Sequence, residues 1–415
     1  MALFGVSTAS VVKWSQRWRA TGSAAAKQMG GWRPLRLQRE CEWLLARIAE
    51  KPDLMLRPVM AELAERGTPA SYGAVWRFFK CEGITFKNAD AARSLWNLWP
   101  VSVMTLGGRG IGMVWGETTF AECVATVHEA VAAGINLIDL APTYGNGKAE
   151  EVVGAAFNGR LPDGVRVTSK CGLGNPPRAD IEPLLRRSIE GSLARLRLSH
   201  LDLFFLHSNV VPDATHPARR PDAAHRMTLY ETFVADVRPV FERLVGEGVI
   251  GAWGLTGIGH PDMIIKLLGE SPAPGAVQCI ANLLDSPGAL KFFDGSAKPH
   301  EIMAAARANE VGVMGIRAVQ AGALTGALDR PLAADHPEMR DYARAAGFRR
   351  LAAELGVSPA LLAHRYALSL PVDTVVLGVK NRAELAECVA GAEAGPLPAD
   401  LVARIDQSVD RTAQA

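Results

Sequence analysis

Residues Asn136–Gly154 read NLIDLAPTYGNGKAEEVVG, and this stretch decides the fold. Its apolar run predicts a short buried strand that ends near Asp139, because Ala-Pro follows and proline rarely continues a strand. Tyr144 comes five residues later, among glycines typical of a turn, and a helix is expected to open at Ala149. An acid at the tip of a strand, with a tyrosine in the loop beyond it, indicates chemistry rather than packing.

The chain around this stretch alternates apolar, strand-like runs with amphipathic helical patterns such as Ile181–Arg195. The predicted strands are Val101–Leu106, Leu137–Leu140, Val165–Ser169, Leu203–Leu206, Val249–Leu255, Ala276–Ala281, Val311–Ile316 and Thr374–Leu377. Eight strands separated by helices predict an α/β protein, a (β/α)8 TIM barrel. A doubly wound sheet is the alternative, but LGGRGIG after the first strand departs from the GxGxxG spacing of that fold.

Two further polar residues follow the ends of neighbouring predicted strands. Lys170 follows Val165–Ser169, and His207 follows Leu203–Leu206. The spacings of 31 residues from Asp139 to Lys170 and 37 from Lys170 to His207 each equal about one βα unit. Each residue alone has an ordinary explanation as a cap, a loop residue or a core residue. Together with Tyr144 at one barrel mouth, where active sites of this fold lie, they indicate catalysis.

These residue types suit the reduction of a carbonyl group. Hydride transfer to a carbonyl leaves an alkoxide that needs a proton, and a tyrosine can donate it. Free tyrosine is a weak acid, with a pKa of about 10, so a lysine ammonium that stabilises the phenolate is useful beside it. An aspartate would hold the lysine in place, and a histidine would orient the carbonyl oxygen. This chemistry requires no metal ion.

The same residues carry a family resemblance. The chain resembles the aldo-keto reductases over about residues 99–408, in stretches that run from the second predicted strand to the last. These are DLAPTYGNGKAEEVVG (Asp139–Gly154), TSKCG (Thr168–Gly172), SIEGSLARLRLSHLDLFFLH (Ser188–His207), GVIGAWGLTG (Gly248–Gly257), VQCIANLL (Val277–Leu284), AGALTG (Ala321–Gly326) and VVLGVKNRAELAE (Val375–Glu387). The resemblance implies that Asp139, Tyr144, Lys170 and His207 form the catalytic tetrad of an NAD(P)-dependent oxidoreductase that interconverts carbonyls and alcohols.

The resemblance also implies a set of cofactor contacts. They are Gly108, Thr256, Gln278, Gly322, Gly378, Val379, Lys380 and Glu384. Two positions depart from the family pattern, because Gly257 replaces an asparagine and Ile316 replaces an aromatic residue that often stacks on the nicotinamide. Lys380 would pair with the 2′-phosphate of NADP, whereas Glu384 would repel that phosphate and suit the ribose hydroxyls of NAD. Both NADP and NAD therefore stay open. The substrate stays open too, because the composition of the long loop Ser208–Thr228 neither demands a charged substrate nor excludes one. The resemblance implies small aldehydes, ketones or sugar lactols.

The first 88 residues differ from the rest of the chain. Residues 1–89 hold 14 Lys/Arg and 7 Asp/Glu, a net charge of about +7. The rest of the chain holds 31 Lys/Arg and 36 Asp/Glu, a net charge of about −5. Helices are expected near residues 7–21, 37–50, 56–66 and 71–83, and this pattern fits either a helix-turn-helix unit or a small helical bundle. The stretches GVSTASVVKWSQRWRATGS, WLLARIAEKPDL and SYGAVWRFFKCEGITFKN resemble a truncated winged helix-turn-helix region of insertion-sequence transposases, over about residues 4–88.

We therefore expect two domains, a transposase-like segment at residues 1–88 and a barrel at 95–415, joined as in a gene fusion. A DNA-binding protein with a passenger or sensor barrel, binding weakly through residues 1–88, is the alternative function, and a catalytically silent barrel is a third. Six scattered cysteines, and no apolar run of membrane-spanning length, predict a cytoplasmic protein that does not enter a membrane. Oligomeric state is not determined by the sequence.

Overall fold

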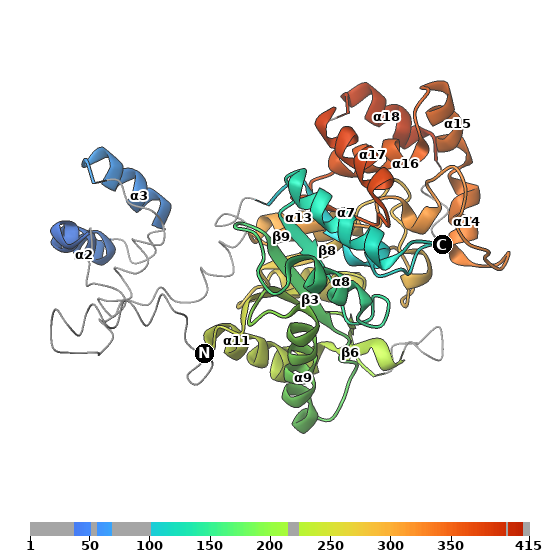
Figure 1. Ribbon diagram of the computed structural model, residues 1–415. Coiled ribbons are helices and arrows are strands. Elements are labelled where there is room, and N and C mark those ends of the chain that lie inside the picture. The colour runs from blue at the N-terminus through green and yellow to red at the C-terminus, as the bar shows by residue number, and fades with distance from the viewer. Residues whose placement is uncertain (1–36, 51–55, 69–100, 215–223, 396, 410–415) are drawn as a thin grey trace, which may run out of the picture. The chain divides into compact units, whose positions relative to one another are not determined.

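The computed structural model describes residues 37–50, 56–68, 101–214, 224–395 and 397–409 (Figure 1). Contacts divide the chain into two compact units, Met1–Lys87 and Asn88–Ala415. In the first unit the described elements are η1 (Gln38–Glu40), α2 (Cys41–Glu50) and α3 (Leu56–Glu65). The expected helices at 37–50 and 56–66 are thus present, and those near 7–21 and 71–83 lie outside the described residues. The resemblance to a transposase helix-turn-helix stays a prediction.

The two described helices of the first unit pack through apolar and charged contacts. Leu44 and Leu63 are fully buried. Arg47 donates to both oxygens of Glu62, at 2.8 and 2.9 Å. α3 ends at Glu65, and Gly67, two residues later, has a φ of +78°, which is costly for any residue with a Cβ.

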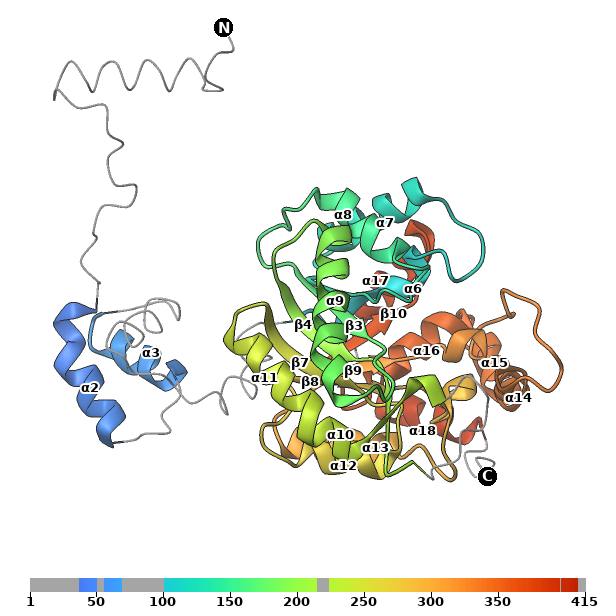
Figure 2. The same ribbon diagram turned by 90° about the horizontal axis from the view of Figure 1, so that it is seen from below.

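The second unit is a closed barrel of parallel strands in the order β1-β10-β9-β8-β7-β4-β3-β2 (Figures 1 and 2). The strands are β1 (Met104–Gly107), β2 (Leu137–Asp139), β3 (Arg166–Cys171), β4 (Leu201–Leu206), β7 (Ile250–Thr256), β8 (Ala276–Ile280), β9 (Gly312–Ile316) and β10 (Thr374–Leu377). Closure through β1, which pairs with both β2 and β10, rules out the doubly wound sheet. The predicted barrel is confirmed, and each predicted strand has its counterpart.

Most strand boundaries lie one to three residues from those predicted. β1 begins at Met104 rather than Val101, and β3 runs on to Cys171. Lys170 therefore lies inside β3, opposite Phe205 of β4, instead of in the loop after it. The prediction failed because lysine is typical of loops, whereas here its backbone continues the ladder and its charge is neutralised inside the protein.

Successive residues of each strand point alternately into the barrel and toward the helices. Leu203 and Phe205 of β4 belong to a small interior cluster with Leu137, Ala252, Ala276 and Met314. Phe204 and Leu206 belong to the larger core under the helices. The same alternation turns four polar side chains near the carboxyl ends of the strands toward the barrel interior. They are Asp139, Lys170, Thr256 and Gln278.

Helices surround this barrel on the outside (Figure 2). They are α6 (Gly108–Ile111), α7 (Phe120–Ala132), α8 (Lys148–Phe157), α9 (Arg178–Leu196), α10 (Tyr230–Thr232), η3 (Phe233–Val237), α11 (Arg238–Gly246), α12 (Pro261–Leu268), α13 (Pro299–Ala308), α16 (Pro359–Leu368) and α17 (Arg382–Glu393). Short 3-10 turns are η2 (Ala224–Arg226), η4 (Gly288–Leu290) and η5 (Gln320–Gly322). Ser358 caps α16 at its N-terminus, because its hydroxyl accepts from the Leu361 amide at 3.1 Å.

Additional elements extend the barrel. α14 (Pro337–Arg344), α15 (Ala346–Glu354) and α18 (Ala399–Gln407) gather beside α16 around a second apolar cluster that includes Phe348 and Tyr366 (Figure 1). Two short parallel strands, β5 (Asn209–Val211) and β6 (Met227–Leu229), occupy the ends of the segment expected to be a loop. No helix in the described part of the chain is both long and apolar enough to cross a bilayer.

Candidate active site

Asp139 and Lys170 form a buried ion pair at the ends of β2 and β3. The Lys170 ammonium donates to Asp139 Oδ1 at 2.7 Å and to the Leu140 carbonyl at 2.8 Å. Burial acts to lower the pKa of Lys170, but the electrostatic and hydrogen-bonding interactions with Asp139, and those with Tyr144, together outweigh it, so the pKa lies above its ordinary value. Lys170 is therefore a fixed cation, although none of its side chain is exposed.

Two neighbouring side chains hold the carboxylate of Asp139 in place. The Thr168 hydroxyl and the Gln278 amide each donate to Asp139 Oδ1 at 2.7 Å. Together with Lys170 they bring three donors to one oxygen, which compensates the carboxylate for its removal from water. Gln278, expected to contact a cofactor, thus also orients Asp139, and the sequence offered no sign of this second contact.

Tyr144 reaches this pair from the turn beyond β2. Gly145 and Gly147 have φ of +63° and +88°, and a Cβ on Gly145 would lie 2.0 Å from the Gly112 carbonyl. Only glycine fits this turn, which brings Tyr144 back over the barrel. Lys170 Nζ lies 4.8 Å from the centroid of its ring.

His207 follows β4 directly. Its amide donates to the Cys171 carbonyl at 2.7 Å, and its ring stands edge-on to that of Tyr144, with centroids 5.9 Å apart. Burial lowers the pKa of His207 well below its ordinary value, and the positive charges of Lys170, Arg109 and Arg226 act in the same direction. The imidazole is therefore neutral at neutral pH and is able to act as a hydrogen-bonding group.

These side chains meet at one cavity of about 770 Å³ at the barrel mouth. Asp139, Tyr144 and His207 line it, and Lys170 lies behind them in contact with Asp139. All eight residues expected to contact a cofactor line the same cavity. Residues separated by up to about 280 positions in the chain thus share one concave surface, the usual form of a small-molecule site.

Lys380 and Glu384 lie together at one part of the cavity wall. Their side chains form an ion pair, and the Lys380 amide donates to Glu384 Oε2 at 3.0 Å. Glu384 also lies in the first turn of α17, which Asn381 caps by accepting from the Glu384 amide at 2.9 Å. The charge of Lys380 is therefore already balanced within the protein.

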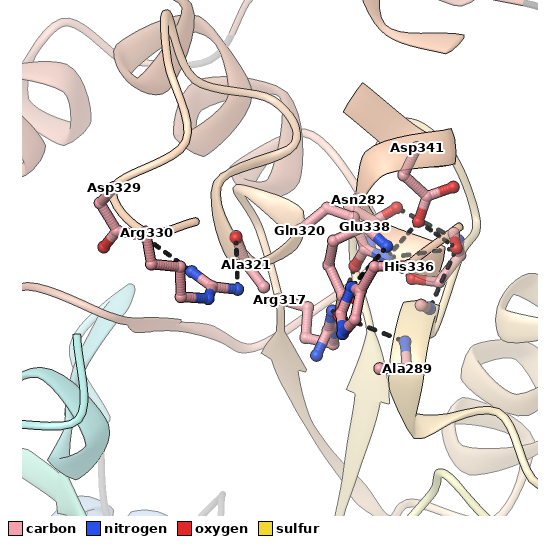
Figure 3. A network of polar contacts seen from close by, with 12 residues as sticks. Asn282, Ala289, Arg317, Gln320, Ala321, Asp329, Arg330, His336, Glu338 and Asp341 are labelled. Carbon is pink, nitrogen blue, oxygen red and sulfur yellow. Dashed lines mark hydrogen bonds and ion pairs between the residues drawn. The ribbon is translucent and has the colours of Figure 1, made fainter. Parts of the chain in front are cut away.

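The loop after β9 is held by a polar network (Figure 3). Arg317 donates to Glu338 Oε1 and to Gln320 Oε1, both at 2.8 Å. Gln320 in turn donates to Asp341 Oδ2 at 2.6 Å. The backbone is strained here, because Arg317, Gln320 and Ala321 have φ of +60°, +47° and +50°, the left-handed region that residues with a Cβ avoid. The network stabilises this conformation on one wall of the cavity.

Three cavity residues were missed from the sequence. The Arg109 guanidinium lies 5.4 Å from the ring centroids of both Tyr144 and Trp115, and Arg330 lies 4.9 Å from that of Trp115. Arg109 follows the Gly-Gly pair at the end of β1, so the rule that sites lie at carboxyl ends of strands could have found it. Trp115 and Arg330 lie further along loops, where no pattern marks them.

Where side chains are described, no group of three or more His, Cys, Asp or Glu is placed to hold a metal ion. Among those residues Cys123, Cys171, Cys279 and Cys388 are free thiols. The site therefore consists of an ion pair, a tyrosine and a neutral histidine at a cavity whose wall has apolar, polar and charged residues.

Comparison of the sequence with known proteins identifies relatives of this chain. The sequence model of the Aldo/keto reductase family matches residues 103–410. The chain is 28% identical to L-galactose dehydrogenase of Arabidopsis thaliana over 182 residues, which cover 43% of this chain and 51% of that protein. It is 26% identical to NADH-specific methylglyoxal reductase of Escherichia coli over 236 residues, 53% of this chain and 64% of that protein. The alignments thus span between half and two thirds of these relatives.

Among solved structures, the glycerol dehydrogenase from Gluconobacter oxydans superposes with a TM-score of 0.56. The superposition covers 76% of this chain and 93% of that structure, at 24% sequence identity. At this identity the likeness shows a common barrel fold and carries no statement about substrate.

Proposed function

Because the chain belongs to the aldo/keto reductase family, we propose that its barrel interconverts a carbonyl compound and an alcohol with NAD(P) as cofactor. The observation that carries this proposal is the meeting of Tyr144, His207 and the Asp139–Lys170 pair at one cavity. Aldehydes, ketones and sugars are the substrate classes in view.

In the proposed reaction Tyr144 donates a proton to the carbonyl oxygen. NAD(P), when bound, would supply the hydride for the carbonyl carbon. Lys170, a fixed cation 4.8 Å from the Tyr144 ring, stabilises the phenolate that remains. Asp139 holds Lys170 by its 2.7 Å hydrogen bond. Neutral His207 hydrogen-bonds the carbonyl oxygen and so orients the substrate.

The eight cavity residues from Gly108 to Glu384 named above are the proposed cofactor contacts. The cavity fits such a group, because its wall is open at Gly378, where a Cβ would meet only Trp115 Nε1, at 4.0 Å. The negative charge of Glu384 balances the positive charge of Lys380. That ion pair therefore offers no unpaired cation that would favour the 2′-phosphate of NADP. The proposal covers both NADP and NAD.

The proposal is tested by turnover of reduced nicotinamide with a panel of aldehydes. Replacing Tyr144 by phenylalanine removes only the proton donor, so kcat should fall by about 10²- to 10⁴-fold, the usual contribution of general acid catalysis. Tyr230→Phe is the matched control, because that hydroxyl bonds to Glu270 on the outside of the barrel. Equal activity of Tyr144→Phe and the wild type would remove Tyr144 from the mechanism.

Residues 95–415 are proposed as the catalytic domain, and residues 1–88 as a separate transposase-like segment with no part in the reaction. The charge of about +7 on residues 1–89 keeps weak DNA binding through that segment as the alternative prediction. Duplex binding by the isolated segment should then weaken steeply with salt, and a segment that fails to bind at low salt excludes this role.

A further inference from the structure

Arg109 lies beside the proposed reaction centre. It is the second residue of α6, directly beyond β1, and its guanidinium stands 5.4 Å from the centroids of both Tyr144 and Trp115. Its charge is one of those that lower the pKa of His207. A positive group therefore stands within electrostatic reach of both residues proposed to contact the carbonyl oxygen.

Four other cations in or behind the cavity wall have a carboxylate partner. Lys170 pairs with Asp139 at 2.7 Å, Lys380 pairs with Glu384, and Figure 3 shows Arg317 with Glu338 and Arg330 with Asp329, at 2.8 and 2.7 Å. Among the described residues Arg109 has neither a hydrogen bond nor an ion pair. Its contacts are the faces of two aromatic rings.

The acids of the cavity are also already engaged. Asp139, Asp329 and Glu384 hold the cations just named, and Glu387 accepts from the Ser358 hydroxyl. No described acid on the cavity wall remains for Arg109. A guanidinium has five donors in a planar fork that matches a carboxylate, and stacking on rings leaves the edge of that fork available.

We propose that Arg109 binds an anionic group of the substrate, and that the natural substrates are short carbonyl compounds that carry a carboxylate. The inference rests on the proposed function, since it assigns the substrate class of the same site. A carbonyl held by Tyr144 and His207 lies within a few bonds of Arg109, so the carboxylate and carbonyl belong to one short chain. Arg109 acts as a specificity-determining residue, and the reaction itself is unchanged.

The test compares two substrates that differ only in charge, 4-oxobutanoate and its methyl ester. The wild type should prefer the free acid in kcat/KM, and added salt should reduce this preference. In Arg109→Met the value for the acid should fall by about 10- to 100-fold, as for loss of a charged hydrogen bond, while that for the ester changes little. Arg109→Lys keeps the charge but not the fork and should retain part of the preference.

Arg160→Met is the control variant, because Arg160 is exposed and lies outside the cavity, yet its replacement changes net charge by the same amount. Cofactor affinity, measured by titration without substrate, should be the same in Arg109→Met and the wild type. Weaker cofactor binding together with an unchanged acid-to-ester ratio would mean that Arg109 holds the cofactor's phosphates, and would overturn the inference.

The wild-type measurement distinguishes failure of this inference from failure of the proposed function. Equal kcat/KM for acid and ester, with both activities lost in Tyr144→Phe, overturns the role of Arg109 and leaves the oxidoreductase intact. Absence of turnover with either compound and with the neutral aldehyde panel removes the proposed function, and the inference with it.

Discussion

At the scale of single residues, the site depends on a lysine that carries charge without contact with solvent. Lys170 is fully buried, and its ammonium is compensated by Asp139 and the Leu140 carbonyl. Burying such a pair costs desolvation of both ions, so its presence fits the proposed role of the charge beside Tyr144 better than a gain in stability.

Replacing Lys170 separates its contribution to stability from its proposed role beside Tyr144. Lys170→Met should lower the free energy of unfolding by about 3–5 kcal/mol, because it leaves the Asp139 carboxylate buried without its cation. Adding Asp139→Asn should recover a substantial part of that loss, since the uncompensated charge disappears. Urea unfolding measures both effects. Activity should stay low in the double variant, and a double variant that regains activity along with stability would contradict the role given to Lys170.

At the scale of elements, loops attached to rigid strands supply much of the cavity wall. The loop after β9 adopts left-handed backbone at Arg317, Gln320 and Ala321, each of which costs free energy for a residue with a Cβ. The buried Arg317–Glu338 pair and the Gln320–Asp341 hydrogen bond offset that cost by fixing the loop to α14. The shape of the wall thus depends on contacts outside the cavity.

The prediction for this element concerns Glu338. Glu338→Gln keeps the shape but removes the charge that faces Arg317, so stability should fall by about 1.5–3 kcal/mol and cofactor affinity should weaken as the loop loosens. Thermal or urea unfolding gives the first quantity, and cofactor titration gives the second.

Glu182→Gln is the comparison for this change, because Glu182 pairs with Arg186 and Arg243 on the surface. Solvent screening limits such exposed pairs to about 1 kcal/mol or less. If both variants lose the same small amount, the network around Arg317 has no special part in holding the loop.

At the scale of the whole molecule, all of the proposed site lies in one unit. Every residue of the cavity belongs to Asn88–Ala415, whereas Met1–Lys87 contributes none of those described. Catalytic function resides in sites rather than in the length of a chain, so the two units are expected to separate in function as they do in contacts.

A truncated protein tests this expectation. A chain of residues 88–415 should keep the kcat/KM and the acid-to-ester preference of the full-length protein, because no proposed contact is removed. Steady-state kinetics of the two proteins, purified side by side, give the answer. A truncated chain that folds by circular dichroism but has lost activity would assign the first unit a part in catalysis.

Sequence patterns alone predicted the barrel and the order of its strands, because alternation of apolar runs and helical stretches is a local property of the chain. They also singled out Asp139, Tyr144, Lys170 and His207, since regular βα spacing brings strand ends to one mouth. The boundary at Lys170 was wrong, because the partners that allow a charged residue inside a strand are 30 positions away.

Only the tertiary structure decided which charges are balanced. Asp139 accepts from Gln278, Arg317 faces Glu338, Lys380 faces Glu384, and Arg109 faces two aromatic rings instead of an acid. Ion pairing depends on distances of a few ångströms between residues that are often far apart along the chain. The sequence by itself therefore determined the architecture and the proposed chemistry, and the folded protein determined where an anionic substrate would find its partner.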